Sequence, residues 1–259
     1  KTVVNLQLED NLWRVMEIGN YYAGYRQINN LFNDFADARI YRRRGPATDA
    51  DEKKFGLDDN AFRVITRDAG GQILNSVLIG KAAADNLYHF ARIEGEKDVF
   101  LITGNFSFPK TAVSWLQQPL LSLSPADIRS LKIGQETAVR SDIIVPFKIK
   151  GKQAVPDISR YLNALGFVAA YDVRRSADFD RLQFSAPKSL TVTTFDGLVV
   201  TIEVYGRTGE EYWASLKFST TTLPTTAVND YIKSSAFLYE DWYFRLAPDV
   251  GRILFNAFI

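Results

Sequence analysis

The chain has no cysteine, and it has only one histidine and one methionine among its 259 residues. Without cysteine it forms no disulfide, no zinc–thiolate site and no cysteine nucleophile. This absence is compatible with an oxidising compartment but does not establish one. The scarcity of methionine, beside 18 phenylalanines and 12 tyrosines, predicts aromatic and well-defined cores.

The sequence also lacks a charge excess and a long apolar run. Its 31 basic and 30 acidic residues give a formal net charge of +1, too small to indicate nucleic acid or an anionic membrane as a partner. No apolar run approaches the roughly 20 residues that span a bilayer, and no signal peptide is visible. Because the chain begins at Lys1 without a methionine, we expect its natural start to lie upstream, where an anchor or export signal could stand.

The motifs of common enzyme classes are missing as well. There is no phosphate-binding loop, no dinucleotide-binding glycine pattern, no zinc-protease motif and no nucleophile elbow. The single histidine, His89, lies between aromatic residues and has no nucleophile pattern near it in the sequence. We therefore expect His89 to have a structural or surface role, and we expect the protein not to be an enzyme.

Acidic residues cluster in residues 49–52 and 178–180. Such carboxylates are the ligands that Ca²⁺ and Mg²⁺ prefer, but the glycine that a calcium loop requires is missing, and Lys53 and Lys54 follow the first cluster. We therefore predict solvated loops, no metal site and no cofactor. A glycosidase-type pair of acids stays open, because it depends on a spatial separation that the sequence does not give.

What the sequence does contain is a pattern that occurs twice. Residues 28–43 in the first half correspond to residues 158–175 in the second, each with apolar residues at helical spacing before a strand pattern. Hairpin patterns follow at residues 62–79 and 190–205. A duplication of this length is domain-sized. We therefore predict an α+β fold made of two tandem copies of a helix packed on an antiparallel β-meander.

The predicted copies are residues 1–134 and 135–259, with the boundary at Gly134–Thr137. A helix expected over residues 225–239 has no partner in the first half, so we interpret it as an insertion in the second copy. The second half is expected to start with a strand over residues 143–150, followed by a helix over residues 157–165.

The segment Leu190-Thr-Val-Thr-Thr-Phe195 alternates apolar and polar residues. This alternation predicts a sheet with one covered face and one wetter face. Asp196-Gly197, which follows it, is the strongest short hairpin signal in the chain and predicts a turn with a positive φ.

Two sets of residues are candidates for binding a ligand or partner. Basic pairs end equivalent strands in the two copies and could line an anionic groove, although short charge runs are usually solvated. Paired tyrosines before the first helix could form an aromatic platform, although large apolar side chains are usually buried. The candidate residues are Arg42, Arg43, Arg174, Arg175, Tyr21 and Tyr22.

The order of several weak motifs resembles domain-of-unknown-function family 4340, whose members are described as periplasmic, auxiliary components of gliding-motility-type ABC transport systems. The segments that carry the resemblance run through nearly the whole chain. They include Asn11-Leu-Trp-Arg-Val15, Phe35-Ala-Asp-Ala-Arg39, Phe55-Gly-Leu-Asp58, Gly80-Lys81, Val99–Ile102, Trp115-Leu116, residues 120–133 and Trp242-Tyr-Phe-Arg-Leu246.

The resemblance implies an extracytoplasmic domain behind an N-terminal transmembrane helix, which this sequence lacks. It also implies protein partners among ABC transporter components, a periplasmic location with anchoring to the inner membrane, and no catalytic residues.

Three functions stay open. The favoured one is a non-enzymatic, membrane-tethered subunit that binds protein partners in an envelope transport or motility assembly. The second is a periplasmic module that binds a glycan or small ligand through aromatic residues. The third is a hydrolase with paired carboxylates. No nucleic-acid partner is expected.

Overall fold

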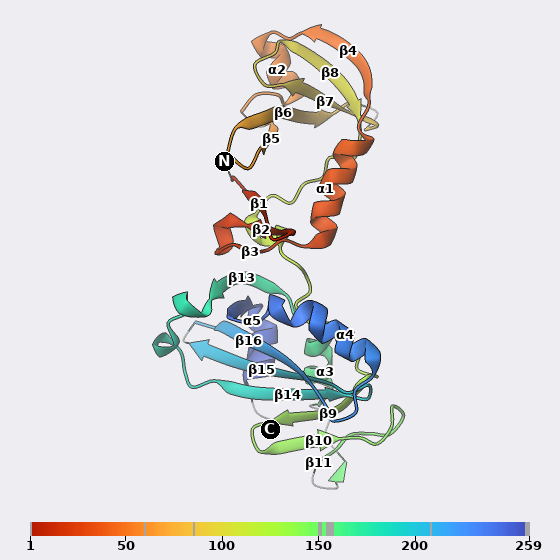
Figure 1. The fold of residues 1–259 in the computed structure, drawn as a ribbon, viewed down its shortest axis with the longest axis vertical. Helices are drawn as coiled ribbons and strands as arrows, with labels where there is room; N and C mark the ends of the chain where they lie inside the picture. Colours follow the sequence, from red (N-terminus) through yellow and green to blue (C-terminus); the bar gives the residue numbers. More distant parts are fainter. Residues whose placement is uncertain are drawn as a thin grey trace. The chain divides into compact units, whose positions relative to one another are not determined.

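A computed structural model describes residues 2–59, 61–84, 86–149, 152–153, 158–207 and 209–256. The chain divides into two compact units, which are coloured along the sequence in Figure 1. Unit 1 combines Lys1–Gly24 with Lys110–Ile259, and unit 2 is Tyr25–Pro109. None of the helices in the described part of the chain has the length and apolar character of a membrane span.

The start of unit 1 is a three-stranded antiparallel sheet of β1 (Leu6–Glu9), β2 (Leu12–Val15) and β3 (Tyr21–Tyr22). The β1–β2 turn uses Asp10 and Asn11, whose φ angles are +51° and +61°. Asparagine and aspartate tolerate this left-handed conformation better than most residues, so the sequence suits a tight hairpin there.

The rest of unit 1 is built on a nine-stranded antiparallel sheet in the order β12-β11-β10-β9-β14-β15-β16-β17-β13. In chain order the strands are β9 (Ile128–Ile133), β10 (Glu136–Val139), β11 (Lys148–Ile149), β12 (Lys152–Gln153), β13 (Ala170–Arg175), β14 (Lys188–Thr194), β15 (Leu198–Arg207), β16 (Glu211–Thr220) and β17 (Trp242–Leu246).

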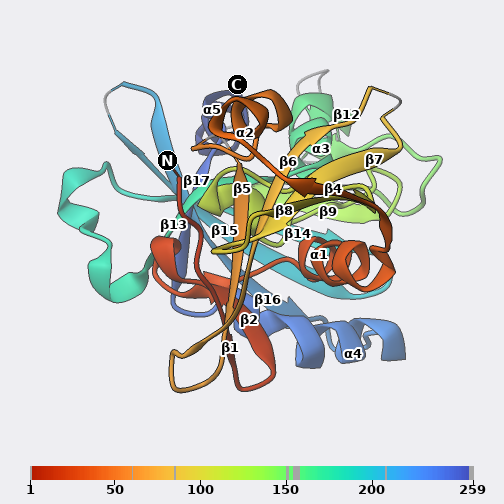
Figure 2. The ribbon, with the colours of Figure 1, turned by 90° about the horizontal axis from the view of Figure 1, so that it is seen from above.

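Alternate residues of the central strands are fully buried on one face of this sheet. Val192 of β14 and Val200, Ile202 and Val204 of β15 have no exposed surface. Helices α4 (Thr226–Ser235) and α5 (Pro248–Phe255) contact this part of the sheet, and α3 (Ile158–Gly166) contacts α5. The view in Figure 2 shows α4 beside β16. The period-two burial follows from the pleat, which directs successive side chains to opposite faces.

Unit 2 is a five-stranded antiparallel sheet in the order β4-β8-β7-β6-β5, with α1 (Tyr25–Asp37) and α2 (Asp49–Phe55). Its strands are β4 (Ile40–Pro46), β5 (Phe62–Arg67), β6 (Ile73–Ala82), β7 (Tyr88–Ile93) and β8 (Asp98–Thr103).

Helix α2 covers part of the unit 2 sheet. It begins with a capping box in which Thr48 and Asp51 satisfy each other's backbone N–H groups. Its last residue, Phe55, stacks on Phe90 of β7 with ring centroids 4.2 Å apart. A Cβ on Gly80 of β6 would lie 2.3 Å from the Phe55 carbonyl oxygen, so only glycine permits this close approach.

The two larger sheets share one pattern of strand order. In each, the strand after a helix lies at an edge beside the last strand of a four-stranded meander, β4 beside β8 and β13 beside β17. The predicted fold class is nevertheless wrong. The structure is mostly antiparallel strand, 41% against 26% helix, and it forms three sheets with five short helices in its described part.

The physical reason lies at the edge of β14. That edge pairs with β9, and β10 to β12 extend the sheet further, so a segment expected in the first copy is part of the second sheet. The predicted boundary at Gly134–Thr137 is the β9–β10 hairpin, where Gly134 has a φ of +59°.

Other predicted elements need smaller corrections. The strand expected over residues 143–150 is a loop followed by β11, and Lys150 lies outside the described residues. The helix expected over 157–165 is α3, although Asp157 also lies outside them. The expected helix over 225–239 is α4 followed by a short 3-10 helix, Ala236–Leu238. The positive φ predicted for the Asp196-Gly197 turn is confirmed, since Gly197 has a φ of +96°.

Candidate binding surface

Arg42 and Arg43 lie on the exposed strand β4 of unit 2. Arg43 forms an ion pair with Asp98 of β8, with Nη2 and Oδ2 2.5 Å apart. The Arg43 side chain is 65% exposed, and ion pairs this accessible to water contribute about 0–1 kcal/mol. The pair therefore ties two strands at the surface. Arg42 and Arg43 lie in a different unit from Arg174 and Arg175.

Arg174 and Arg175 are consecutive residues of β13, so their side chains leave opposite faces of the sheet. The Arg174 guanidinium lies 4.6 Å from the ring centroid of Trp213, and that of Arg175 lies 4.9 Å from that of Trp242. Each arginine therefore stacks on its own tryptophan. The two side chains do not line a common groove.

Tyr21 is buried, and its hydroxyl donates a hydrogen bond to the Leu238 carbonyl oxygen at 2.9 Å. Its ring packs edge-on against Trp242 and Phe244, and burial raises its pKa well above the ordinary value. Tyr22 is half-buried under the guanidinium of Arg14. The structure therefore brings Tyr21 and Arg175 together at Trp242, as parts of the packing within unit 1.

His89 is half-buried on β7, with its Nδ1 atom 3.4 Å from the Gly80 carbonyl oxygen and its ring edge-on to Phe106. The acidic clusters serve local structure. The Asp51 carboxylate completes the capping box of α2 by accepting a hydrogen bond from the Thr48 backbone N–H, and Glu52 pairs with Arg92. Asp180 accepts a hydrogen bond from the Gln183 side chain. Within the described residues, no three histidine or acidic side chains are grouped as metal ligands.

Part of the second face of the nine-stranded sheet is accessible to solvent, and its residues follow from the strand register. Toward β13 the same face is covered, because Tyr205, Trp213 and Tyr243 are buried there with Phe179. We call it the open face and define it by three rows that run across the strands. The rows are Lys148, Val139, Ser130, Thr193, Val199 and Ser219; then Thr137, Lys132, Thr191, Thr201 and Lys217; then Ser189, Glu203 and Ser215. All of these residues are exposed or half-buried.

The open face is rich in hydroxyl groups and positively charged. Lys132, Lys148 and Lys217 lie in the first two rows, and those rows contain no carboxylate. Glu203, in the third row, is the single acid of the defined face. Lys132 and Lys217 are three strands apart, about 14 Å at ordinary strand spacing.

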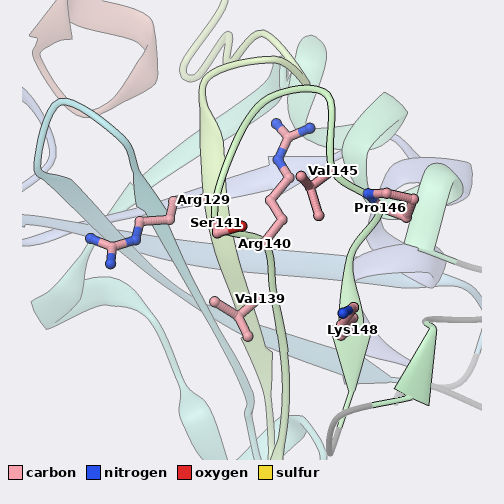
Figure 3. A pocket seen from close by; sticks show the side chains of 7 residues that line it. All are labelled: Arg129, Val139, Arg140, Ser141, Val145, Pro146 and Lys148. Carbon is pink, nitrogen blue, oxygen red and sulfur yellow. The ribbon is translucent and has the colours of Figure 1, made fainter.

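A hollow of about 350 Å³ adjoins the first row of the open face. It is lined by Arg129, Val139, Arg140, Ser141, Val145, Pro146 and Lys148. Figure 3 shows that the Arg140 guanidinium points under the neighbouring loop while the Arg129 side chain points away from it. The arginines therefore do not converge on one point in the hollow.

Arg140 is 9% exposed, and its guanidinium donates to four backbone carbonyl groups. The acceptors are Ile128, Ile143, Pro125 and Ala126, with donor–acceptor distances from 2.5 to 2.9 Å. Burial lowers its pKa, and the nearby charges of Asp142 and Asp127 oppose that shift. Because its donors are used in this way, Arg140 holds the loop that follows it rather than a ligand.

Sequence reasoning found part of this site. The alternation in β14 predicted a wetter face, and the register of β14 with β15 and β16 extends that face. Lys132 and Lys148 were missed, because their strands were expected to lie at a domain boundary or within a longer strand. Arg140 was missed because nothing in its local sequence distinguishes a buried arginine from a solvated one.

A family model described as a domain of unknown function, DUF4340, matches residues 13–156. The match extends over more than half of the chain and includes β9, β10 and Arg140. No curated protein matches the chain. The segment Trp242–Leu246, which contributed to the resemblance in sequence, lies beyond the matched residues. On the extent of this match, the chain belongs to the DUF4340 family of proteins with a domain of unknown function.

Proposed function

We propose that this protein is a non-enzymatic, membrane-tethered extracytoplasmic subunit that binds an acidic protein partner through the open face. The assembly would be one for envelope transport or motility, with ABC transporter components as candidate partners. The observation that carries the proposal is the charge of the first two rows, where three lysines stand among hydroxyl groups without a carboxylate.

The form of the surface favours binding over catalysis. An active site needs an acid, base or nucleophile held beside preorganised groups in a water-excluded pocket. The open face is a solvent-accessible sheet, and the adjoining hollow is built around a guanidinium that already serves four carbonyl groups. The imidazole of His89, the single histidine, lies beside the Gly80 carbonyl oxygen and the Phe106 ring.

The residue types favour a protein partner. Single-stranded nucleic acid is usually bound by aromatic side chains on which bases stack, and the three rows contain none. A glycan-binding platform would use exposed aromatics, but Tyr21 is buried and Tyr22 packs beside Arg14 and Phe237. Lysines spread over a hydroxyl-rich sheet surface suit an acidic protein surface, which they would attract and orient.

Site-specific photo-crosslinking in cells tests the proposal. A photoreactive amino acid at Thr191 or Thr201, in the middle of the second row, is expected to capture one discrete partner. The same group at Thr66 of β5, an exposed strand position in unit 2, is the control and should not capture it.

A charge-reversal variant then tests the chemistry. Lys132→Glu with Lys217→Glu should abolish the crosslink and, with the purified partner, weaken binding at least ten-fold in a salt-dependent manner. Lys53→Glu with Lys54→Glu on α2 makes the same change of charge away from the open face and should have no effect. Retention of the crosslink by the Lys132/Lys217 variant would reject the open face as the binding surface.

A further inference from the structure

The loop between β10 and β11 presents two isoleucines to solvent. Ile143 is 53% exposed, and Ile144 is 89% exposed. Such side chains in a flexible loop would fold inward against the sheet to escape water. Here the Arg140 guanidinium binds the Ile143 carbonyl oxygen and the turn at Pro125 and Ala126 at the same time, which fixes the loop backbone beside Ile143. The apolar tip is therefore held outward.

Further apolar residues lie at the same end of the sheet. Phe195, 37% exposed, donates its backbone N–H to the backbone carbonyl oxygen of Asp127, and its ring lies 5.6 Å from the Arg140 guanidinium. In the next turn, the Gly197 carbonyl oxygen accepts a hydrogen bond from the Thr221 backbone N–H. Leu223 follows two residues after Thr221 in the chain. Leu223 is 90% exposed. This end of unit 1 thus carries aliphatic side chains on two separate loops.

Positive charge lies behind the apolar tip. The charged residues that line the adjoining hollow are Arg129, Arg140 and Lys148, with no acid among them. Two carboxylates lie near. Asp142 accepts a hydrogen bond from the Ile144 backbone N–H, and Asp127 lies in the turn that Phe195 contacts. Both carboxylates are exposed, but neither lines the hollow, whereas Arg129 and Lys148 do.

We infer that the loop of residues 141–147, called here the Ile143 loop, contacts the surface of an anionic phospholipid bilayer. The isoleucines would enter the acyl region, and Lys148 and Arg129 would lie at the level of the phosphates. The loop has an apolar tip with cationic residues behind it. A bilayer interface has the same order, with acyl chains inside and anionic phosphates outside. Because Ile144 is 89% exposed, acyl chains would surround it on nearly all sides without any rearrangement of the loop.

Vesicle sedimentation tests this inference. The full chain is mixed with vesicles of phosphatidylcholine alone, or with about one third phosphatidylglycerol, and the bound fraction is measured. Binding should be stronger to the anionic vesicles. Ile143→Ser with Ile144→Ser should lower the partition coefficient at least about ten-fold, because transfer of exposed aliphatic surface into acyl chains supplies most of the binding. Lys148→Gln should lower it only for the anionic vesicles.

The matched control is Ile73→Ser with Leu74→Ser on β6. These adjacent aliphatic residues are 50% and 59% exposed and lie in unit 2, so their replacement should leave binding unchanged. The inference is overturned if the native chain does not sediment, or if the Ile143/Ile144 variant binds as well as the native chain. It is also overturned if inorganic phosphate alone binds in calorimetry and blocks sedimentation, since the hollow would then take a free anion.

Discussion

At the scale of single residues, Arg140 is the one charged residue of the described chain that falls among the buried residues. Removing such a charge from water is unfavourable, and no carboxylate forms an ion pair with it among the described residues. Four carbonyl acceptors offset that cost and connect the turn at residues 125–128 with the Ile143 loop. A methyl-terminated side chain of similar length would fill the space but leave the carbonyl groups without donors.

We therefore predict that Arg140→Met destabilises unit 1 by about 2–4 kcal/mol, because buried acceptors that lose their donors cost about 1–3 kcal/mol each until the loop opens to water. Urea denaturation followed by circular dichroism measures the change. Arg129→Met is the control, since Arg129 is exposed and its loss should change stability by less than about 0.5 kcal/mol. Equal effects of the two substitutions would contradict the bracing role of Arg140.

The role of an aromatic side chain also depends on which residues the fold places around it. Tyr21 and Tyr22 are equally aromatic in sequence, yet Tyr21 is buried against Trp242 and Phe244 while Tyr22 is half-buried beside Arg14. Stacking of an arginine on an aromatic ring contributes about 0.5–2 kcal/mol, so arginines that look like a basic patch in sequence can serve packing. Arg174 and Arg175 are examples, each over its own tryptophan.

At the scale of secondary-structure elements, α5 approaches β16 as closely as a glycine allows. Gly251 lies inside α5 and is buried, and a Cβ built on it would be 2.3 Å from the Cβ of Tyr212. Alanine would favour the helix itself by about 1 kcal/mol over glycine. The clash is with the base of a side chain fixed on a strand, so it is relieved only by moving the helix away from the sheet.

We expect the clash to exceed the gain in helix propensity. Gly251→Ala should destabilise unit 1 by about 1–3 kcal/mol net, the usual cost of overpacking a core. Thermal unfolding followed by near-ultraviolet circular dichroism, which reports the packed aromatic residues, is the measurement. Gly166→Ala, in helix α3 of the same unit, provides the comparison, because the nearest atom to its added Cβ is the Leu123 carbonyl oxygen at 3.9 Å, an ordinary contact. A stabilised Gly251→Ala variant would show that α5 packs less closely than described.

At the scale of the whole molecule, unit 1 is formed by two chain segments that meet where unit 2 is inserted. Gly24 donates its backbone N–H to the Trp115 carbonyl at 2.6 Å, and Ala23 forms an isolated β-bridge with Leu116. The two ends of unit 1 at the insertion are therefore held close by unit 1 itself. Unit 2 has a core of its own, with Leu57, Leu78 and Val99 buried against α2.

This arrangement predicts that unit 1 folds without unit 2. Replacing residues 25–109 with a flexible linker of about six glycine and serine residues, long enough to join neighbouring ends, should leave a cooperatively folded protein. Near-ultraviolet circular dichroism and a single thermal transition are the readouts. Residues 25–109 expressed alone should likewise unfold cooperatively. A shortened chain that lacks fixed aromatic signals would show that the units depend on one another for folding.

Several local features were predictable from the sequence because their causes are local. Helical apolar spacing indicated α1 and α3, although the observed ends of these helices differ by one or two residues from the expected ones. Asp196-Gly197 indicated a turn, because few residues other than glycine adopt a positive φ without strain. Alternation in β14 indicated one buried face and one wetter face of a sheet. Each of these signals acts within about ten residues of the chain.

Pairing between distant strands could not be predicted in the same way. Whether β14 presents a free edge or accepts β9 depends on a contact between residues about 60 positions apart, and backbone hydrogen bonds form with any sequence. That pairing replaced the expected tandem copies with one extended sheet and added Lys132 and Lys148 to the open face.

The sequence by itself determined which residues turn, alternate and form helices. Only the tertiary structure decided which strands share a sheet and which arginine is buried, because burial and strand pairing are properties of neighbours that the chain brings together from a distance.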